Sequence, residues 1–249
     1  MIRKKVLVSI PGALIDRFIE KNQFGQILGN PVEDWVPRVA PAKERMWGYY
    51  CILEPLDVSR HGADLFKAYQ FNNPGDTWTY LPFGPFETYE EFDKWLKARS
   101  ALEGYIFFTV IDKNTHLPQG IASYHHLDLA HGTVEVGAIH YSKRLQKTRA
   151  ATEAMYLMMY QIFQKLGYRR YQWRCDSLNQ ASRNAAERLG FTFEGIFRQT
   201  NVFKGRNRDT AWYSIIDSEW PILKGKFEKW LDPNNFDENG NQKVKLKEI

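Results

Sequence analysis

The 249-residue sequence has few cysteines, no long apolar run and no large excess of either charge. Its two cysteines, Cys51 and Cys175, lack the spacing of a metal-binding or redox pair, so we interpret them as reduced core residues. No stretch approaches the length that spans a bilayer, which argues against a membrane protein. The apolar stretch near the start is broken by Pro11 and Asp16, which is atypical of a secretory signal, so we expect a cytoplasmic protein.

The charge balance is mildly basic, with 34 Lys and Arg residues against 29 Asp and Glu residues. The excess is spread along the chain, and no basic block alternates with stacking aromatic residues, so a nucleic-acid partner is not expected. A solvated surface explains the excess, and an anionic cofactor would also use it. Hydrophobic residues make up 43% of the chain, close to the globular average, which allows a sizeable core.

Residue patterning divides the chain into three parts. Residues 1–46 carry four prolines and hold no period beyond a short helix near 13–21, so they are predicted to form an N-terminal extension that wraps the domain. Residues 47–231 alternate strand-like and helix-like segments and are predicted to form one domain. Residues 232–249 are rich in Asn, Asp and Lys, so we expect this polar tail to be frayed or disordered.

The middle part predicts an α+β domain, with a sheet between two layers of helices. Thr88 and Glu91 form a capping box, and apolar residues at helical spacing continue from Ala154 to Leu166, before Gly167 as a C-cap. The strands are predicted at 47–56, 105–112, 120–127, 133–141, 170–176, 191–198 and 209–216. The helices are predicted at 58–71, 88–99, 151–166, 179–189 and 219–230.

The strand at 133–141, the loop after it and the helix from 151 form a unit whose helix N-terminus presents unpaired backbone N–H groups. Such an end binds anions, and the small residues Ala150 and Ala151 would let a pyrophosphate approach closely. The loop adds positive charge from Lys143, Arg144, Lys147 and Arg149. The pattern alone is equally compatible with a capped helix whose basic residues face water.

Further motifs make this unit specific. Gln146-Lys147-Thr148-Arg149-Ala150-Ala151-Thr152-Glu153-Ala154 is followed, after one strand, by the segment from Asn179 to Phe191. With Leu53-Glu54-Pro55-Leu56 and Trp78-Thr79-Tyr80-Leu81-Pro82 upstream, this order resembles the GNAT superfamily, in particular its ribosomal-protein alanine N-acetyltransferases. The resemblance implies the GNAT acyl-CoA N-acyltransferase fold, a mixed central sheet with splayed central strands, and acetyl-CoA as co-substrate.

The resemblance also implies donor-binding residues. In the family, a loop of the form Gln/Arg-x-x-Gly-x-Gly/Ala holds the CoA pyrophosphate, with Arg149 here in place of the usual glycine. The residues of this loop are Gln146, Lys147, Thr148, Arg149, Ala150, Ala151 and Thr152. The strand end implied to pair with the pantetheine arm is Ile139, His140 and Tyr141.

Two polar residues after the next strand also match the family. Asn179 matches an asparagine that helps to hold CoA, and Ser182 matches a serine that protonates the departing thiolate. Helix N-capping and ordinary polar exposure are the alternative roles for both residues.

The proton acceptor is less clearly marked. Glu135 lies on the strand face opposite Val134 and Val136, so it is a candidate catalytic base, with a salt-bridged structural glutamate as the alternative. The resemblance places a catalytic glutamate of the ribosomal-protein branch at Asn201, and asparagine cannot accept a proton.

Three histidines lie on the neighbouring strands and could relay a proton. They are His125, His126 and His140. Adjacent strand residues face opposite sides, so at most one of His125 and His126 is expected to face a cleft. No metal site is expected, because the histidines lack a matching set of acidic or thiol partners.

These observations predict transfer of an acetyl group to a primary amine, in a ternary complex, with a small molecule or a protein N-terminus as acceptor. Neither a nucleic acid nor a membrane is an expected partner. The alternative is a non-catalytic acyl-CoA-binding or regulatory protein of the same fold, motivated by Asn201 and Arg149. Residues 1–46 have no counterpart in the family pattern and would either cover the acceptor cleft or form a homodimer contact.

Overall fold

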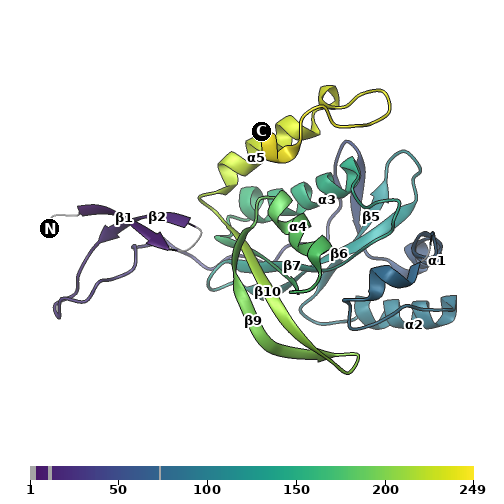
Figure 1. The fold of residues 1–249 in the computed structure, drawn as a ribbon, viewed down its shortest axis with the longest axis horizontal. Coiled ribbons are helices and arrows are strands. Elements are labelled where there is room, and N and C mark those ends of the chain that lie inside the picture. The colour runs from purple at the N-terminus through teal and green to yellow at the C-terminus, as the bar shows by residue number, and fades with distance from the viewer. Residues whose placement is uncertain (1–3, 11–12, 73) are drawn as a thin grey trace.

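A mixed eight-stranded sheet runs through the molecule (Figure 1), in a computed structural model that describes residues 4–10, 13–72 and 74–249. The order of the strands is β3-β4-β5-β6-β7-β8-β10-β9. They are β3 (Met46–Trp47), β4 (Cys51–Pro55), β5 (Ile106–Asp112), β6 (Pro118–Asp128), β7 (Thr133–Tyr141), β8 (Arg170–Asp176), β9 (Thr192–Phe203) and β10 (Arg206–Ile216). Among these described strands only β7 and β8 pair in parallel, so the predicted mixed sheet is confirmed.

Helices cover both faces of the sheet, which confirms the predicted three-layer arrangement (Figure 1). One face carries α1 (Val58–Tyr69) and α2 (Tyr89–Ser100), joined through the 3-10 helix η1 (Pro74–Trp78). The other carries α3 (Arg149–Tyr160), α4 (Gln180–Arg188) and α5 (Trp220–Leu231). A π-helical turn, η2 (Gln161–Lys165), extends α3, and Gly167 follows it with φ 65°, as its C-cap role predicts. None of the described helices combines the length and hydrophobicity needed to span a bilayer.

Alternation along the strands separates two apolar clusters. Phe108 of β5 and Ala122 of β6 belong to the larger cluster, which includes the apolar face of α3. Phe107 and Ile121, their neighbours along the same strands, belong to the cluster under α1 and α2. The two-residue period therefore fixes which face of the sheet each helix pair covers.

Glu153 joins the second turn of α3 to the start of β4. Its buried carboxylate accepts hydrogen bonds from the backbone N–H groups of Tyr49 (2.7 Å), Tyr50 (2.7 Å) and Cys51 (2.8 Å). Gly48 is required beside it, because a Cβ there would lie 2.2 Å from Oε2 of Glu153. One carboxylate thus satisfies three backbone donors and sets the distance between α3 and the sheet.

The hairpin of β9 and β10 is longer than the sequence predicted. Lys204 and Gly205 at its tip have φ of 50° and 72°, which is the backbone of a tight hairpin turn. The Lys204 ammonium donates to the carbonyl of Trp78 at 3.0 Å. The tip is therefore held against the connection between α1 and α2.

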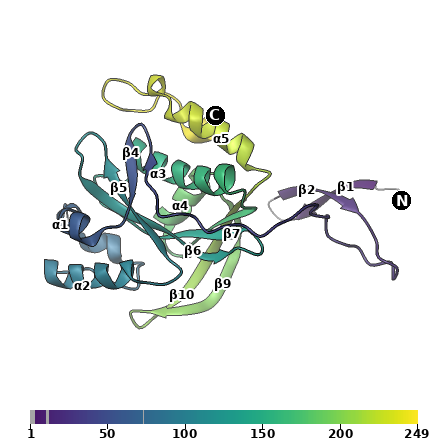
Figure 2. The ribbon, with the colours of Figure 1, turned by 180° about the vertical axis from the view of Figure 1, so that it is seen from behind.

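The N-terminal extension begins with a hairpin, β1 (Lys4–Ile10) and β2 (Ala13–Ile19), from which the chain runs on to β3 and β4 (Figure 2). The helix predicted near 13–21 is wrong, because β2 pairs with β1 along its whole length. Residues 1–3 and 11–12 of the extension lie outside the described part of the chain.

Farther along, the extension docks on the domain. The Trp35 indole donates to the carbonyl of Ala130 (2.8 Å), and the Tyr168 hydroxyl donates to the carbonyl of Val39 (2.9 Å). Ala130 lies in the β6–β7 turn, at the end of β7 opposite Tyr141. The extension is thus fixed to the domain at that end.

The prediction of a frayed or disordered tail at 232–249 is wrong. Phe236 and Leu246 are buried in the main core cluster, and a β-bridge joins Phe236 to Gln242. The indole of Trp230 donates to the side-chain carbonyl of Gln242 at 2.8 Å. Two buried apolar residues, together with this hydrogen bond, therefore hold the segment against α5.

We expect Glu153→Ala to lower the free energy of unfolding by about 3 kcal/mol, because three buried N–H groups lose their acceptor. Urea unfolding followed by circular dichroism measures the change. Glu228→Ala is the matched control, since Glu228 is exposed and its partners among the described residues are Lys224 and the Tyr156 hydroxyl; its effect should stay below about 1 kcal/mol. Equal losses in the two variants would contradict the anchoring role.

Candidate active site

β7 and β8 pair over only part of their length. Their parallel register runs from Thr133 opposite Arg170 to Val136 opposite Trp173. Both strands continue past this point, β7 to Tyr141 and β8 to Asp176, without pairing with each other. The predicted splay of two central strands is therefore present, and it leaves backbone N–H and C=O groups along a gap in the middle of the sheet.

A bulge in β7 accompanies the gap. Ala138 has φ 48°, and the register with β6 shifts between the pairs at Ile121 and Ser123. The Ser123 hydroxyl donates to the carbonyl of Gly137 at 2.9 Å. The bulge turns the end of β7 away from β8 while keeping it bonded to β6.

The strand end predicted to pair with the pantetheine arm lies along this gap. Ile139 is half-buried there, while the side chain of His140 is buried against Trp78, with 3.7 Å between ring centroids. Nε2 of His140 lies 3.0 Å from Oγ1 of Thr77. Burial lowers the pKa of His140 to about 3, so the ring is neutral at physiological pH and is a weak proton acceptor.

The N-terminus of α3 has the predicted form. The Thr148 hydroxyl caps it, accepting from the N–H of Ala151 at 3.1 Å. Arg149, which stands where the family has glycine, is the first residue of the helix, and the left-handed residue is Lys147, with φ 62°. The N–H groups of Arg149 and Ala150 have no acceptor within the helix, as expected of a first turn.

Only two of the four basic residues predicted to surround the N-terminus of α3 lie near it. The Lys143 ammonium donates to Asp76 at 2.8 Å, and the Arg144 guanidinium lies 4.0 Å from the ring centroid of Phe71. Both side chains contact the α1–α2 connection. The remaining two predicted residues, Lys147 and Arg149, line a cavity.

This cavity, which we call the α3 cavity, opens at the start of α3 and has a volume of about 800 Å³. Its walls come from α3, from the turn after β5, from the end of α4 and from the C-terminal tail. Its charged lining residues are Lys147, Arg149, Arg188, Lys245 and Asp112. Four cations against one carboxylate suit a polyanionic ligand.

Arg188 is a cavity residue that the sequence reasoning missed. It donates to the hydroxyl of Thr152 on α3, and its guanidinium lies 5.4 Å from the ring centroid of Trp230. No carboxylate among the described residues forms an ion pair with it, so its charge is available to a ligand. The sequence feature that could have identified it is its position two residues before Gly190, in the segment that resembles the family.

Arg149 is held between two aromatic rings. Its guanidinium lies 4.7 Å from the centroid of Tyr50 and 4.8 Å from that of Phe236. Stacking keeps the charge at the cavity wall without neutralising it. The C-terminal tail, which supplies Phe236, thus helps to shape the α3 cavity.

Asn179 and Ser182 lie together at the start of α4. The side-chain oxygen of Asn179 caps the helix, accepting from the N–H of Ser182 at 3.1 Å. The Ser182 hydroxyl accepts from the indole of Trp173 at 3.0 Å. Trp173 is the last β8 residue paired with β7, so Ser182 lies where the gap begins.

Glu135 lies on the opposite face of the sheet from α3, as its alternation predicts. Its carboxylate is buried, with Oε2 2.5 Å from Arg174 and Oε1 3.4 Å from Nε2 of His125. Burial raises the pKa of Glu135, but hydrogen bonds and charges from His126, His125 and Arg174 outweigh burial and leave the pKa lowered. Glu135 is therefore an ion-paired glutamate, and its carboxylate also contacts two histidine rings.

Both rings of the His125–His126 pair face Glu135, so the expectation that these adjacent residues face opposite sides of the strand is wrong. His126 has φ 47°, and the β6–β7 register shifts between His125 and Asp128. The bulge breaks the alternation and places Nδ1 of His126 3.3 Å from Oε2 of Glu135. We call Glu135, His125, His126 and Arg174 the Glu135 cluster.

The expectation that the histidines lack an acidic partner is therefore wrong, because His125 and His126 both contact Glu135. Ligand atoms of His125, His126 and Glu135 lie within 4.8 Å of one another, a set that could hold a metal ion. Arg174 competes for the same place, because its guanidinium contacts the Glu135 carboxylate and lies 2.9 Å from Nδ1 of His126. A cationic side chain already fills the position that a metal would need.

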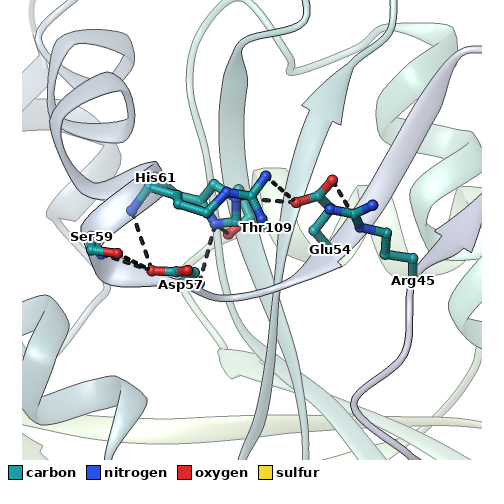
Figure 3. Close-up of polar contacts among 7 residues, drawn as sticks. Arg45, Glu54, Asp57, Ser59, His61 and Thr109 are labelled. Carbon is teal, nitrogen blue, oxygen red and sulfur yellow. Dashed lines mark hydrogen bonds and ion pairs between the residues drawn. The ribbon is translucent and has the colours of Figure 1, made fainter.

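A separate polar cluster holds the start of α1 against the sheet (Figure 3). The buried carboxylate of Glu54 on β4 pairs with Arg45 (3.1 Å) and with His61 of α1 (3.4 Å). Nδ1 of His61 lies 3.0 Å from the Thr109 hydroxyl on β5. The cluster fixes α1, and so the α1–α2 connection that contacts Lys204, against β4 and β5.

Comparisons with known proteins agree with this geometry. The family model of the acetyltransferase (GNAT) domain matches residues 51–192. The crystal structure of a GCN5-related N-acetyltransferase from Brucella melitensis is 45% identical, with a TM-score of 0.85, over 87% of this chain and 98% of that chain. A probable GNAT acetyltransferase from Chromobacterium violaceum ATCC 12472 is 39% identical, with a TM-score of 0.73, over 78% of this chain and 96% of that chain.

A curated relative comes from Bacillus subtilis (strain 168) and is provisionally named ribosomal N-acetyltransferase YdaF. It is 25% identical over 173 residues, which cover 68% of this chain and 91% of the relative.

His140 gives a prediction for stability against pH. Its folded pKa of about 3 lies below the ordinary value of about 6.5, so the unfolded chain takes up a proton first as the pH falls. This contribution to stability is complete above pH 6.5 and should fall by about 2 kcal/mol between pH 7 and pH 5. Urea unfolding at both pH values should show a smaller loss for His140→Phe than for the wild type; equal losses would contradict the assignment.

Proposed function

The chain belongs to the GNAT acetyltransferase family and is an N-acetyltransferase, and we propose that it moves the acetyl group from acetyl-CoA to the amino terminus of a protein. The observation that carries the donor assignment is the gap between β7 and β8, with the N-terminus of α3 and the α3 cavity beside it. The acceptor assignment is supported by the name of the Bacillus subtilis relative. A cytoplasmic location follows from this class of acceptor.

The α3 cavity fits the phosphates of CoA. We assign the pyrophosphate to the open N–H groups at the start of α3, within the loop Gln146, Lys147, Thr148, Arg149, Ala150, Ala151 and Thr152. Arg188 adds a guanidinium from α4 that donates to Thr152 and has no carboxylate partner among the described residues, and Asn179 caps the helix that borders the gap. Acetyl-CoA supplies the acetyl thioester when bound, and these residues bind and orient it.

The gap is proposed to hold the reacting centre. The edge of β7 at Ile139, His140 and Tyr141 offers backbone groups to the pantetheine arm, and an N–H there is a candidate donor to the oxyanion. Ser182 lies where the gap begins and is the proposed donor of a proton to the leaving sulfur. On the other face, Glu135 belongs to the proposed proton-accepting group.

The proposed function suggests a division of the chain into three parts. We propose residues 47–231 as the acetyltransferase domain and residues 1–46 as an added N-terminal segment. The contacts of Trp35 and Val39 at the far end of β7 favour a role for this segment in association with another chain over a role as a cover for the site. The tail from 232 is proposed as part of the donor site, because Phe236 and Lys245 line the α3 cavity.

A thiol-release assay tests the proposal. Purified protein is mixed with acetyl-CoA and with peptides of varied first residue, each also prepared with a blocked amino terminus, and with a panel of small amines and aminoglycosides. Free amino termini should support thiol release and the blocked peptides should not. Turnover confined to small amines would overturn the acceptor assignment, and absence of acetyl-CoA binding in calorimetry would overturn the donor assignment.

Arg188→Ala should raise the KM for acetyl-CoA by about tenfold, because a charge-assisted contact with phosphate is lost, with little change in kcat. Steady-state kinetics at saturating acceptor measure both constants. Arg183→Ala is the matched control on the same helix, since Arg183 donates to the Tyr213 hydroxyl and does not line the cavity. A KM equal to that of the control would exclude Arg188 from donor binding.

A further inference from the structure

His126 is the exposed member of an otherwise buried cluster. Its side chain is 57% exposed, whereas those of His125 and Glu135 are 7% and 6% exposed. Its backbone adopts φ 47°, a conformation that a non-glycine residue adopts rarely. The turn in the backbone presents the imidazole of His126 to solvent while keeping its Nδ1 against the cluster.

The contacts of His125 and Glu135 favour one set of hydrogen positions. Nδ1 of His125 lies 2.5 Å from Nδ1 of His126, so one of these atoms must donate and the other accept. A hydrogen on Nε2 of His125 donates to Oε1 of Glu135, at 3.4 Å, which leaves Nδ1 of His125 as the acceptor. Nδ1 of His126 then carries hydrogen and Nε2 bears the lone pair at the exposed end of the ring, with a guanidinium nitrogen of Arg174 2.9 Å from Nδ1 and 3.4 Å from Nε2.

The environment maintains this arrangement. Gly137 leaves room for His125, because a Cβ at Gly137 would lie 2.3 Å from Nε2 of that ring. Arg174 donates to Oε2 of Glu135, and its guanidinium also lies 4.7 Å from the Trp212 ring centroid. Burial first, and then the neighbouring His126 ring and the Arg174 guanidinium, lower the pKa of His125 to about 4 despite Glu135, so the ring stays neutral and holds one tautomer.

His126 also lies close to the gap. Arg174 is the first β8 residue after the last β7–β8 pair, and its guanidinium lies 2.9 Å from Nδ1 of His126. The hairpin that carries Trp212 is held at its tip to the α1–α2 connection, on the same side of the sheet. An amine that reaches the gap from this side therefore passes the exposed imidazole.

We propose that His126 is the residue that takes the proton from the attacking amine, directly or through one water, and that Glu135 and His125 are positioning residues. The proposal rests on the N-acetyl transfer proposed above. The nitrogen lone pair forms the C–N bond, the C–S bond breaks with its electron pair on sulfur, and the sulfur takes up a proton to leave as a thiol. The proton lost by nitrogen goes to Nε2 of His126 and from there to solvent, so atoms and charge balance.

The kinetic test replaces His126 with residues that tolerate its backbone. His126→Asn should lower kcat by about 100-fold with the KM for acetyl-CoA unchanged within about twofold, because general-base catalysis is lost while donor binding is kept. His116→Asn is the matched control, since His116 is an exposed turn residue with φ 58°. Retained kcat in His126→Asn, together with lost kcat in Glu135→Gln, would overturn the proposal in favour of direct proton transfer to Glu135.

Two readouts separate proton transfer from a structural role. Added imidazole should restore part of the kcat of His126→Gly but not that of Glu135→Gln, and the acidic limb of the kcat–pH profile should disappear in His126→Asn. The groups facing His126 that also shape this profile are His125, Glu135 and Arg174. Absence of rescue, with an unchanged profile, would contradict a proton-accepting role.

The tautomers can be measured without turnover. Nitrogen-15 NMR of the histidine rings should show hydrogen on Nδ1 of His126 and on Nε2 of His125 at pH 7. The reverse pattern, or stoichiometric zinc bound through these rings, would overturn the proposal. Absence of thiol release by the wild-type protein would instead count against the proposed acetyl transfer. Failure of the His126 proposal and failure of the proposed function can therefore be distinguished.

Discussion

The site depends on a hydrogen-bond ladder that stops early. β7 and β8 cease to pair after Val136, although both strands continue, and the bulge at Ala138 keeps β7 attached to β6 while it leaves β8. Unpaired backbone groups are tolerated in the middle of a sheet only where a ligand or water can satisfy them. The gap also lies between the N-terminus of α3 and the Glu135 cluster. Helix α3 covers one face of β7, and the Glu135 side chain extends from the other face.

Three buried carboxylates serve this arrangement in different ways. Glu153 is satisfied by backbone N–H groups and fixes α3, and Glu54 is paired between side chains that fix α1. Glu135 is also fully paired, but one of its partners, His126, is mostly exposed. The exposed partners of Glu54 are the guanidinium groups of Arg45 and Arg60, which cannot accept a proton, whereas the network of Glu135 ends in an exposed imidazole, which can.

Sequence patterns predicted what depends on local chemistry. The helix from Arg149, its Thr148 cap and its Gly167 end follow from apolar spacing and capping rules, and the proposed donor loop lies at the start of this helix. The facing of His125 and His126 could not be predicted, because a bulge reverses the two-residue alternation on which that prediction relied. The role of Arg188 depends on the tertiary approach of α4 to α3, and the order of the C-terminal tail depends on two apolar contacts that composition alone understates.

The residues of the C-terminal tail that line the α3 cavity are translated later than the other residues of the proposed donor site. Residues 239–242 and Lys245 line the α3 cavity, and they are translated after every strand of the sheet and all five α-helices. A nascent chain can therefore pair its strands and cap α3 while the cavity still lacks one wall. The α3 cavity is therefore complete only after these segments have left the ribosome and folded back against α5.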